Sequence, residues 1–423
     1  MGISDFRKIR EIFIPESSLT ALDQFVAKPV KVNVYVDGSF YIYLGCSTFN
    51  MNQDSKSYSS RKVAESAATI IYNNVCKIKK IRDVANVIVF FDGKRPRPKL
   101  KTSKKRIASK SIQLNVCESI YHLCKILNSH NYIIYNLTIG ESEHEIVIHR
   151  DVSLPSIILT DDSDIFHIAY DYEDMTCNDY IFVCSKNLAT TYDLYSLPKI
   201  MKMPKMLFSL LCILRGCDFT KSTFTTTMMM AIIQEYKNGS CSDLIRELEQ
   251  RCKRFNVEEK EIAYTIRKSD SIVYNNIISE EVEVEQINGI YKADDVVFIM
   301  KLLLKMLLQS KMKFRWNVED KQSLISCRKF NIQTHLDCIV WSLNYGLIGS
   351  RYVDYNKKLE PPNVVDFFLF YYWILTENLE GLIYNKTDDD DSFGILDVNY
   401  KLYIHKNLSN FNSLSFNIDP GKS

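Results

Sequence analysis

Three short apolar runs that end in acidic residues constrain the fold of this chain more than any other feature of its sequence. The runs are rich in β-branched and aromatic residues, which favours β-strands. They cover residues 32–36, 87–91 and 157–159, and they end at Asp37, at Asp92 and at the group Asp161, Asp162 and Asp164. Stretches with helical periodicity lie between them, at residues 62–80 and 111–128. Strands that alternate with helices predict a mainly parallel sheet, so the acidic strand ends are expected to meet at one edge.

The fold class expected from this pattern is α/β: a twisted, mostly parallel sheet flanked by helices, followed by a mainly helical C-terminal region. Strand candidates at residues 132–135 and 180–184 would extend the sheet. From about residue 200 the periodicity is helical, for example at 206–216 and 242–255. The 423 residues leave room for more than one domain at roughly 150 residues each. We therefore expect two domains, 1–235 and 236–423.

Carboxylates are concentrated between residues 141 and 164. A single aspartate at a strand end is most often a turn or helix-cap residue, but three converging strand ends favour a shared site. The candidate ligands are Asp37, Asp92, Glu141, Glu143, Asp162, Asp164 and Asp218. Hard divalent cations prefer oxygen ligands, and two of them about 4 Å apart can activate water for phosphodiester cleavage. Because so many carboxylates would repel one another without cations, we expect two Mg²⁺ ions, with Mn²⁺ as a substitute.

A basic segment begins directly after Asp92. Between Gly93 and Cys117 the chain has no acidic residue. The basic residues there are Lys94, Arg95, Arg97, Lys99, Lys101, Lys104, Lys105, Arg106 and Lys110. A run of like charges is usually a solvated surface, whereas one that starts beside a strand-end carboxylate is well placed to hold a phosphate backbone over a metal site. Both interpretations stay open at this point.

Several other classes of protein fit the sequence poorly. The net charge is only +2, so the overall charge does not indicate a nucleic-acid binder and only the local segment does. No uncharged apolar run approaches the roughly 18 residues of a membrane span, so membrane association is not expected. The twelve cysteines contain no C-x-x-C pair, and we expect reduced thiols. His144 and His149 have no cysteine at ligand spacing, so zinc is not expected.

Six short motifs occur in a fixed order along residues 1–235. They are Met1-Gly2-Ile3, Val36-Asp37-Gly38-Ser39, Phe91-Asp92-Gly93-Lys94-Arg95-Pro96, Gly140-Glu141-Ser142-Glu143, Thr160-Asp161-Asp162-Ser163-Asp164 and Ile213-Leu214-Arg215-Gly216-Cys217-Asp218-Phe219. Each motif is weak alone, but together they resemble the flap endonuclease/XPG superfamily of structure-specific nucleases. The resemblance implies the PIN-like fold of flap endonucleases, with helices on both faces of the sheet and a helical arch over the site.

The resemblance also implies roles for individual residues. The seven candidate carboxylates would hold two metal ions directly or through water, and Lys99 and Arg106 would be the catalytic cations that stabilise the transferred phosphate. Tyr43 falls at the position of a base-stacking aromatic residue. Further DNA contacts are expected from Lys94, Arg95, Arg97, Lys101, Lys104 and Lys105.

One pair of candidate ligands is ambiguous. On a regular helix Glu141 would share a face with Glu145, while Glu143 would point elsewhere. The family motif instead pairs Glu141 with Glu143 at a helix start, where long side chains can still converge. We follow the motif and expect Glu141 and Glu143 to belong to the site.

The resemblance is weaker after residue 219. Typical members continue with a helix–turn–helix, G-x-G-x-K, that grips duplex DNA beside a monovalent cation, whereas residues 222–230 contain neither Gly nor Pro. No sliding-clamp peptide and no basic tail are evident. The altered turn, the chain length and the abundance of Asn, Ile, Lys and Tyr, which is typical of an A+T-rich genome, together most resemble the poxvirus branch of the family. That branch implies viral DNA recombination, double-strand break repair and genome maturation in the host cytoplasm, with viral replication or recombination proteins as partners and packaging in the virion.

The expected function is therefore an Mg²⁺-dependent, structure-specific DNA nuclease that acts on branched, flap or junction DNA, with 5′–3′ exonuclease activity. Two alternatives stay open. Residues 341–345 resemble a segment of the large exoribonucleases, which would make the chain a 5′–3′ exoribonuclease-like enzyme. A catalytically inactive, nuclease-shaped DNA-binding or scaffold protein is the other; the altered helix–turn–helix favours it, and the complete carboxylate set disfavours it.

Overall fold

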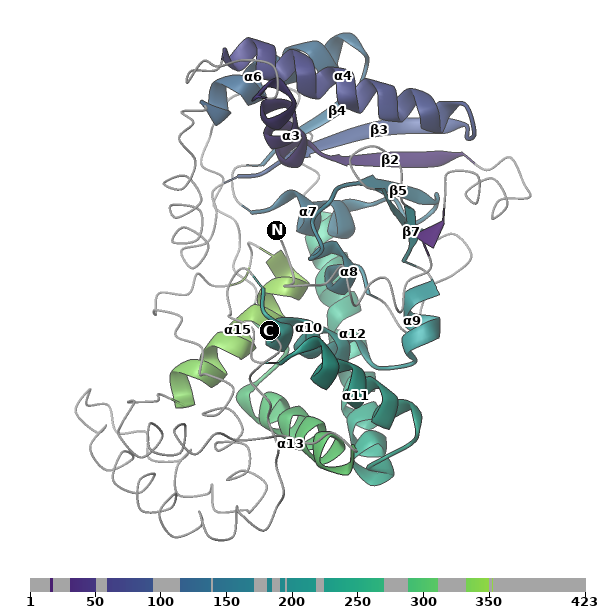
Figure 1. Ribbon diagram of the computed structural model, residues 1–423, viewed down its shortest axis with the longest axis vertical. Coiled ribbons are helices and arrows are strands. Elements are labelled where there is room, and N and C mark those ends of the chain that lie inside the picture. Colours follow the sequence, from purple (N-terminus) through teal and green to yellow (C-terminus); the bar gives the residue numbers. More distant parts are fainter. Residues whose placement is uncertain are drawn as a thin grey trace, which may run out of the picture.

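The structure, a computed structural model, places one β-sheet between two groups of helices (Figure 1). It describes residues 16–17, 31–50, 59–93, 115–137, 140–170, 181–184, 191–194, 196–217, 224–269, 288–310, 332–349 and 352. Among these residues, no helix is long and apolar enough to cross a membrane.

The sheet is mostly parallel. Its strands are β1 (Glu16–Ser17), β2 (Val32–Asp37), β3 (Val84–Phe91), β4 (Ile133–Asn136), β5 (Ser156–Leu159), β6 (Ile181–Cys184) and β7 (Thr191–Asp193). Their order across the sheet is β1-β7-β6-β5-β2-β3-β4. The neighbours from β6 to β4 are parallel, and β7 and β1 add an antiparallel edge. The expected α/β class is thus confirmed, and the antiparallel edge is a feature that the sequence did not indicate.

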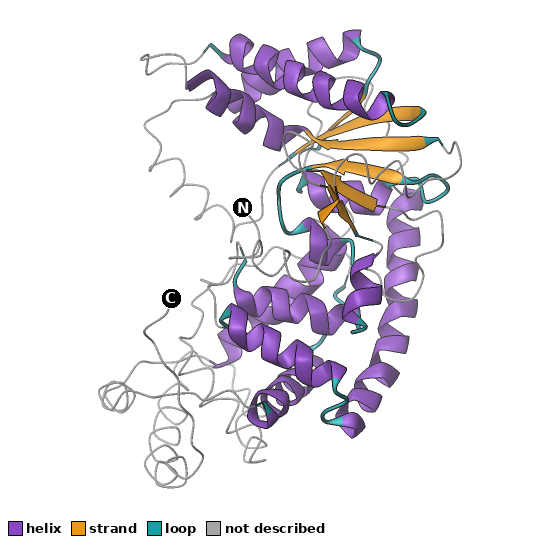
Figure 2. Cartoon of the chain, turned by 45° about the vertical axis from the view of Figure 1, so that its right-hand side comes forward, coloured by secondary structure: helices purple, strands orange, loops and turns teal. Residues whose placement is uncertain are grey.

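Both faces of the sheet are buried, because successive residues of each strand point to opposite sides. Val34 and Val36 of β2 belong to a hydrophobic cluster with the helices of one face, and Tyr35 belongs to the cluster of the other face. The first face is covered by α3 (Gly38–Asn50), α4 (Ser60–Lys79) and α6 (Val116–Ser129). Figure 2 shows these helices on one side of the strands and the remaining helices on the other.

The second face carries a larger helical layer. Its helices are α7 (Ser142–His149), α8 (Ile165–Ile168), α9 (Ser196–Met201), α10 (Lys205–Arg215), α11 (Thr226–Lys237), α12 (Ser242–Ser269), α13 (Ala293–Gln309) and α15 (Ile332–Ile348). One hydrophobic cluster runs from Ile158 of the sheet through Leu211 to Leu303 and Leu336. Residues on both sides of position 235 therefore share a core, although the expected boundary itself stays a prediction.

Helix α11 begins within residues 222–230, the stretch that lacks the glycines of the motif it was compared with. Its N-cap, Thr225, accepts a hydrogen bond from the backbone N–H of Met228 at 3.2 Å. Met228 and Met229 are buried in the core. These methionines thus pack as the start of a helix.

Candidate functional site

The candidate site lies where the direction of the strand order reverses. From β2 the chain adds β3 and β4 on one side, and it then returns to place β5 on the other side of β2. In parallel sheets ligands bind at such a switch point, beyond the carboxyl ends of the strands. Asp37 is the last residue of β2, Asp92 follows β3 directly, and Asp162 lies just after β5. The expected strand-end carboxylates therefore share this edge.

The hydroxyl of Ser142 brings three of the carboxylates together. Its Oγ lies 2.8 Å from Oδ1 of Asp37, 3.0 Å from Oδ1 of Asp92 and 3.4 Å from Oε2 of Glu143. The backbone N–H of Ser142 also donates to Oδ1 of Asp92 at 3.0 Å. Because one hydroxyl carries one hydrogen, Ser142 can donate to only one of these carboxylates at a time. One hydroxyl hydrogen therefore cannot satisfy all three carboxylates.

Asp37 is held rigidly by the protein. Its Oδ1 also accepts a hydrogen bond from the N–H of Phe40 at 3.0 Å, so it caps the start of α3, and its Oδ2 accepts one from the hydroxyl of Thr160 at 3.1 Å. The sequence left capping a helix and belonging to a site as alternative roles for a strand-end aspartate. Asp37 caps a helix and also lies in the candidate site. Thr160 continues the network, because it accepts from the N–H of Asp162, whose Oδ1 accepts from the N–H of Asp164, each at 3.1 Å.

Two loops that carry candidate ligands are tied to each other. The N–H of Gly93, next to Asp92, donates to the carbonyl of Gly140 at 2.9 Å. Gly140 has φ of 100°, a conformation that L side chains rarely adopt, which explains a glycine directly before Glu141. The N–H of Asp92 donates to the hydroxyl of Ser39 at 2.8 Å. These bonds fix the loop after β3 against the start of α7.

Glu143 belongs to the acidic cluster, and Glu145 does not. Glu141 has extended backbone angles and stands one residue before α7, so the spacing rule for helix faces does not apply to it. The side chain of Glu145 is buried and lies 3.1 Å from Nε2 of His149, one turn further along the helix. The charge on Glu143 instead interacts with those on Asp37, Asp92, Asp162 and Glu141.

Burial and mutual repulsion make the cluster hard to ionise. Burial, followed by the charge on Asp92, raises the pKa of Asp37 to about 7, although hydrogen bonds from Phe40 and Ser142 act in the opposite direction. Burial and the four neighbouring carboxylates raise the pKa of Glu143 well above its ordinary value. Crowding these groups together without a cation therefore opposes folding at neutral pH.

This electrostatic strain predicts that the metal-free protein becomes less stable as pH rises from about 4 to about 7. Asp37 has a pKa of about 7 in the folded protein and an ordinary value of 3.8. Asp37 therefore holds more proton in the folded state than in the unfolded state in this window, and the stability that it contributes is full below about pH 4 and is lost as pH rises through about 7. Thermal unfolding in EDTA at several pH values measures the effect.

A divalent cation should reverse this trend, because it favours the ionised carboxylates. We expect the stabilisation by Mg²⁺ to be larger at pH 8 than at pH 5.5. Asp37→Asn supplies the control and should flatten the pH dependence in EDTA. An equal pH dependence in the wild-type protein and in this variant would contradict the assignment of the titrating group.

The donor set fits a hard divalent cation by its chemistry. The groups around Ser142 are carboxylate and hydroxyl oxygens, which Mg²⁺ and Mn²⁺ prefer. Within the part of the chain that the structure describes, no three His, Cys, Asp or Glu side chains are already arranged around a single ion position. The oxygens are thus gathered at one edge but not in coordination geometry.

Of the other expected site residues, the structure describes Tyr43 but not Asp218 or the basic segment. Tyr43 lies on α3 with 42% of its surface exposed, so its ring is accessible for stacking. Asp218 lies outside the described residues, as do all the expected catalytic and DNA-binding cations of the basic segment: Lys94, Arg95, Arg97, Lys99, Lys101, Lys104, Lys105 and Arg106. Their assignments stay predictions.

The structure adds four residues that sequence reasoning missed. Ser39, Ser142 and Thr160 lie inside the motifs, and each bonds a candidate ligand or its backbone. Their hydroxyls, within two residues of an acidic residue in the motifs, were the available signal. The fourth is Tyr345 of α15, whose hydroxyl donates to Oε2 of Glu141 at 3.2 Å from 204 positions further along the chain. Nothing local in the sequence indicated that contact.

Comparisons with known proteins give similarities of fold alone. No protein-family model and no curated protein matches the chain. Among solved structures, the catalytic core of Rad2 in complex with DNA substrate is 19% identical, with 77% of this chain and 93% of that chain covered and a TM-score of 0.40. Human GEN1 in complex with Holliday junction DNA is 13% identical, covering 78% and 81%, with a TM-score of 0.34. The T5 D15 protein co-crystallised with metal ions is 11% identical, covering 74% and 98%, with a TM-score of 0.32. Similarity at this level carries no argument about function. The functional argument rests on the chemistry of the site.

Proposed function

We propose that the chain is a metal-dependent, structure-specific DNA nuclease. The observation that carries the proposal is the set of carboxylates, Asp37, Asp92 and Glu143, gathered around one buried hydroxyl at the switch point of a parallel sheet. Two divalent ions bound there would activate water and stabilise the charge on the leaving oxygen of a phosphodiester. The choice of flap or junction DNA as substrate rests on the motifs that resemble flap endonucleases.

The residues of the chain divide into three roles in this proposal. Asp37, Asp92, Glu141, Glu143, Asp162, Asp164 and Asp218 would hold the two ions, directly or through water. Lys99 and Arg106 would face the phosphate and stabilise its negative charge as the bond breaks. The remaining cations of the basic segment would bind the backbone, and Tyr43 would stack on a base. The products would carry 5′-phosphate and 3′-hydroxyl ends.

The loss of folding stability caused by the crowded carboxylates disfavours the alternative of an inactive scaffold protein. A buried carboxylate with a pKa of about 7, such as Asp37, reduces folding stability at neutral pH. A protein that only binds DNA gains nothing from this arrangement, and neutral side chains in the same places would relieve it. The exoribonuclease alternative rests on residues 341–345. The rings of Trp341 and Tyr345 in that segment are buried in α15 and stack on each other, so packing explains why both positions are aromatic.

A cleavage assay tests the proposal and its alternatives together. The full chain is incubated with 5′-flap, Holliday-junction and nicked DNA and with single-stranded RNA, in Mg²⁺ and in EDTA. We expect cleavage of a branched DNA in Mg²⁺ and none in EDTA. Preference for the 5′ end of RNA would replace the proposal with the exoribonuclease, and binding without cleavage of any substrate would replace it with the scaffold.

The biological setting belongs to the proposal as well. The resemblance to the poxvirus branch supports a role in viral DNA recombination, double-strand break repair and genome maturation in the host cytoplasm. Viral replication or recombination proteins would be the partners, and the protein would enter the virion. Cell fractionation during infection, with detection of the chain at cytoplasmic replication sites, tests this part separately from the chemistry.

A further inference from the structure

Helix α15, from the C-terminal half of the chain, packs closely against the two helices that follow candidate ligands. A Cβ added at Gly346 would lie 3.1 Å from Cε1 of His167 on α8, and one added at Gly349 would lie 3.3 Å from Cβ of His144 on α7. Gly349 also has φ of +69°, which favours glycine. In Figure 1, α15 extends from the lower helices up to α7 and α8. The glycines thus let this helix approach the acidic edge.

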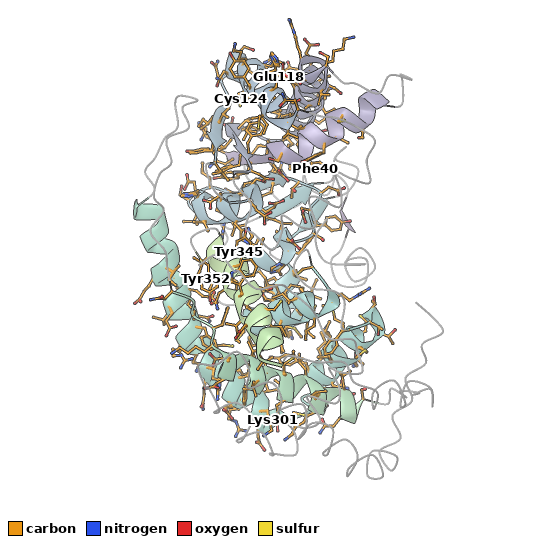
Figure 3. All side chains as sticks on the ribbon, turned by 90° about the vertical axis from the view of Figure 1, so that its left-hand side faces the viewer. Phe40, Glu118, Cys124, Lys301, Tyr345 and Tyr352 are labelled. Carbon is orange, nitrogen blue, oxygen red and sulfur yellow. The ribbon has the colours of Figure 1, made fainter. Side chains whose placement is uncertain are left out.

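Tyr345, labelled on α15 in Figure 3, contacts Glu141 at that edge. Its ring is 1% exposed, is stacked on Trp341 at a centroid distance of 4.8 Å, and meets the ring of His144 edge-on at 4.9 Å. These contacts restrict the ring, and its hydroxyl then donates to Oε2 of Glu141. The orientation of this hydroxyl is therefore fixed by packing from two sides.

Glu141 needs such a partner. Its side chain is 5% exposed, and an ionised carboxylate is costly to bury unless it accepts hydrogen bonds. A phenolic donor stabilises the carboxylate and fixes the direction in which its oxygens point. The charge on Glu141 is also one of the causes that raise the pKa of Glu143.

We infer that Tyr345 is a positioning residue, which orients the Glu141 carboxylate for the metal site. The inference rests on the proposed function, because Glu141 is a ligand only in that proposal. It gives the C-terminal half a role: α15 completes the site that residues 1–235 carry. Tyr345 acts through Glu141 and makes no contact with the substrate.

The test compares two variants of the full chain that each remove one buried hydroxyl. Tyr345→Phe removes the donor to Glu141. Tyr170→Phe is the matched control, because Tyr170 is also 1% exposed, stacks on Phe208 and donates to the carbonyl of Met203 at 2.7 Å. Mg²⁺ alone is the probe, and its binding is measured by calorimetry and by the rise in unfolding temperature during a Mg²⁺ titration.

We expect Tyr345→Phe to weaken Mg²⁺ binding by about 10- to 100-fold, the usual effect of removing a residue that orients a metal ligand. Tyr170→Phe should bind Mg²⁺ like the wild-type protein. The unfolding temperatures of the two variants in EDTA should be similar. Unchanged Mg²⁺ binding in Tyr345→Phe, or equally weakened binding in both variants, would overturn the inference.

A double variant tests whether Tyr345 acts through Glu141. In a Glu141→Gln background, Tyr345→Phe should cause no further decrease in Mg²⁺ affinity, because the group it orients is already changed. A further decrease of the same size would overturn the inference. Failure of the proposed function is distinguishable: Mg²⁺ binding that depends on Tyr345 without any cleavage removes the nuclease, whereas cleavage with Mg²⁺ dependence unchanged in Tyr345→Phe removes only the role of Tyr345.

Discussion

Asp162→Asn is expected to lower the rate of DNA cleavage in Mg²⁺ by about 100-fold or more, while DNA binding persists or tightens. Removal of a residue that merely orients a ligand typically lowers metal affinity or activity by about 10- to 100-fold, and removal of a ligand should have at least that effect. Asn keeps an oxygen that can accept the hydrogen bond from the N–H of Asp164, so the loop is retained. Binding should not weaken, because one negative charge near the phosphate backbone is removed.

The stability of this variant separates a metal ligand from a structural aspartate. The charge on Asp162 raises the pKa of both Asp37 and Glu143. Its removal should therefore relieve repulsion, and the metal-free variant should unfold at the same temperature as the wild-type protein or a higher one. A variant with lowered stability and proportionally lowered activity would identify Asp162 as structural.

The neighbouring aspartate supplies a matched control for this experiment. Asp161 is exposed, is adjacent in the sequence and is outside the candidate ligand set. Asp161→Asn changes the net charge by the same amount and should leave the single-turnover rate close to that of the wild-type protein. Wild-type turnover by Asp162→Asn, or the same decrease in both variants, would exclude Asp162 as a ligand.

The edge of the sheet that carries the site could be predicted because its signals are local. An apolar run that ends in an acid marks both a buried strand and the position of its carboxylate, and parallel strands bring such ends together. Asp37, Asp92 and Asp162 illustrate this, since each lies at or just after the end of β2, β3 or β5. The spacing of helix faces was less useful for Glu141, because that residue precedes the helix and is not part of it.

Contacts between distant segments could not be predicted in the same way. Ser142 lies in a motif, but its hydroxyl becomes informative only when Asp37 and Asp92 are seen within hydrogen-bonding distance of it. Tyr345 reaches Glu141 across 204 positions, and the apolar pattern of α15 indicates only that the helix is buried. The short strands β1 and β7, at the antiparallel edge, are too brief to give a periodic signal. In each case the missing information is tertiary.

The basic segment gives the second large effect: Lys99→Ala and Arg106→Ala should each lower the single-turnover rate at saturating DNA by about 100- to 1,000-fold. That is the typical decrease when one group that stabilises developing charge in a transition state is removed. Both residues lie outside the described part of the structure, so the expectation rests on their positions in the sequence. Saturating DNA matters, because an effect that remains there lies in the chemical step and not in affinity.

Lys104→Ala and Lys105→Ala are the matched comparison within the same segment. If these lysines only neutralise backbone phosphates, their removal should weaken binding and leave the rate at saturation close to that of the wild-type protein. The dependence of log affinity on log salt concentration should become shallower by about 0.9 for each duplex phosphate that is no longer neutralised. Binding isotherms at several KCl concentrations and single-turnover cleavage, measured on the same four variants, separate the two roles. Equal behaviour of all four variants would mean that the segment acts as one solvated, non-specific phosphate-binding surface, and that Lys99 and Arg106 have no special part in the chemical step.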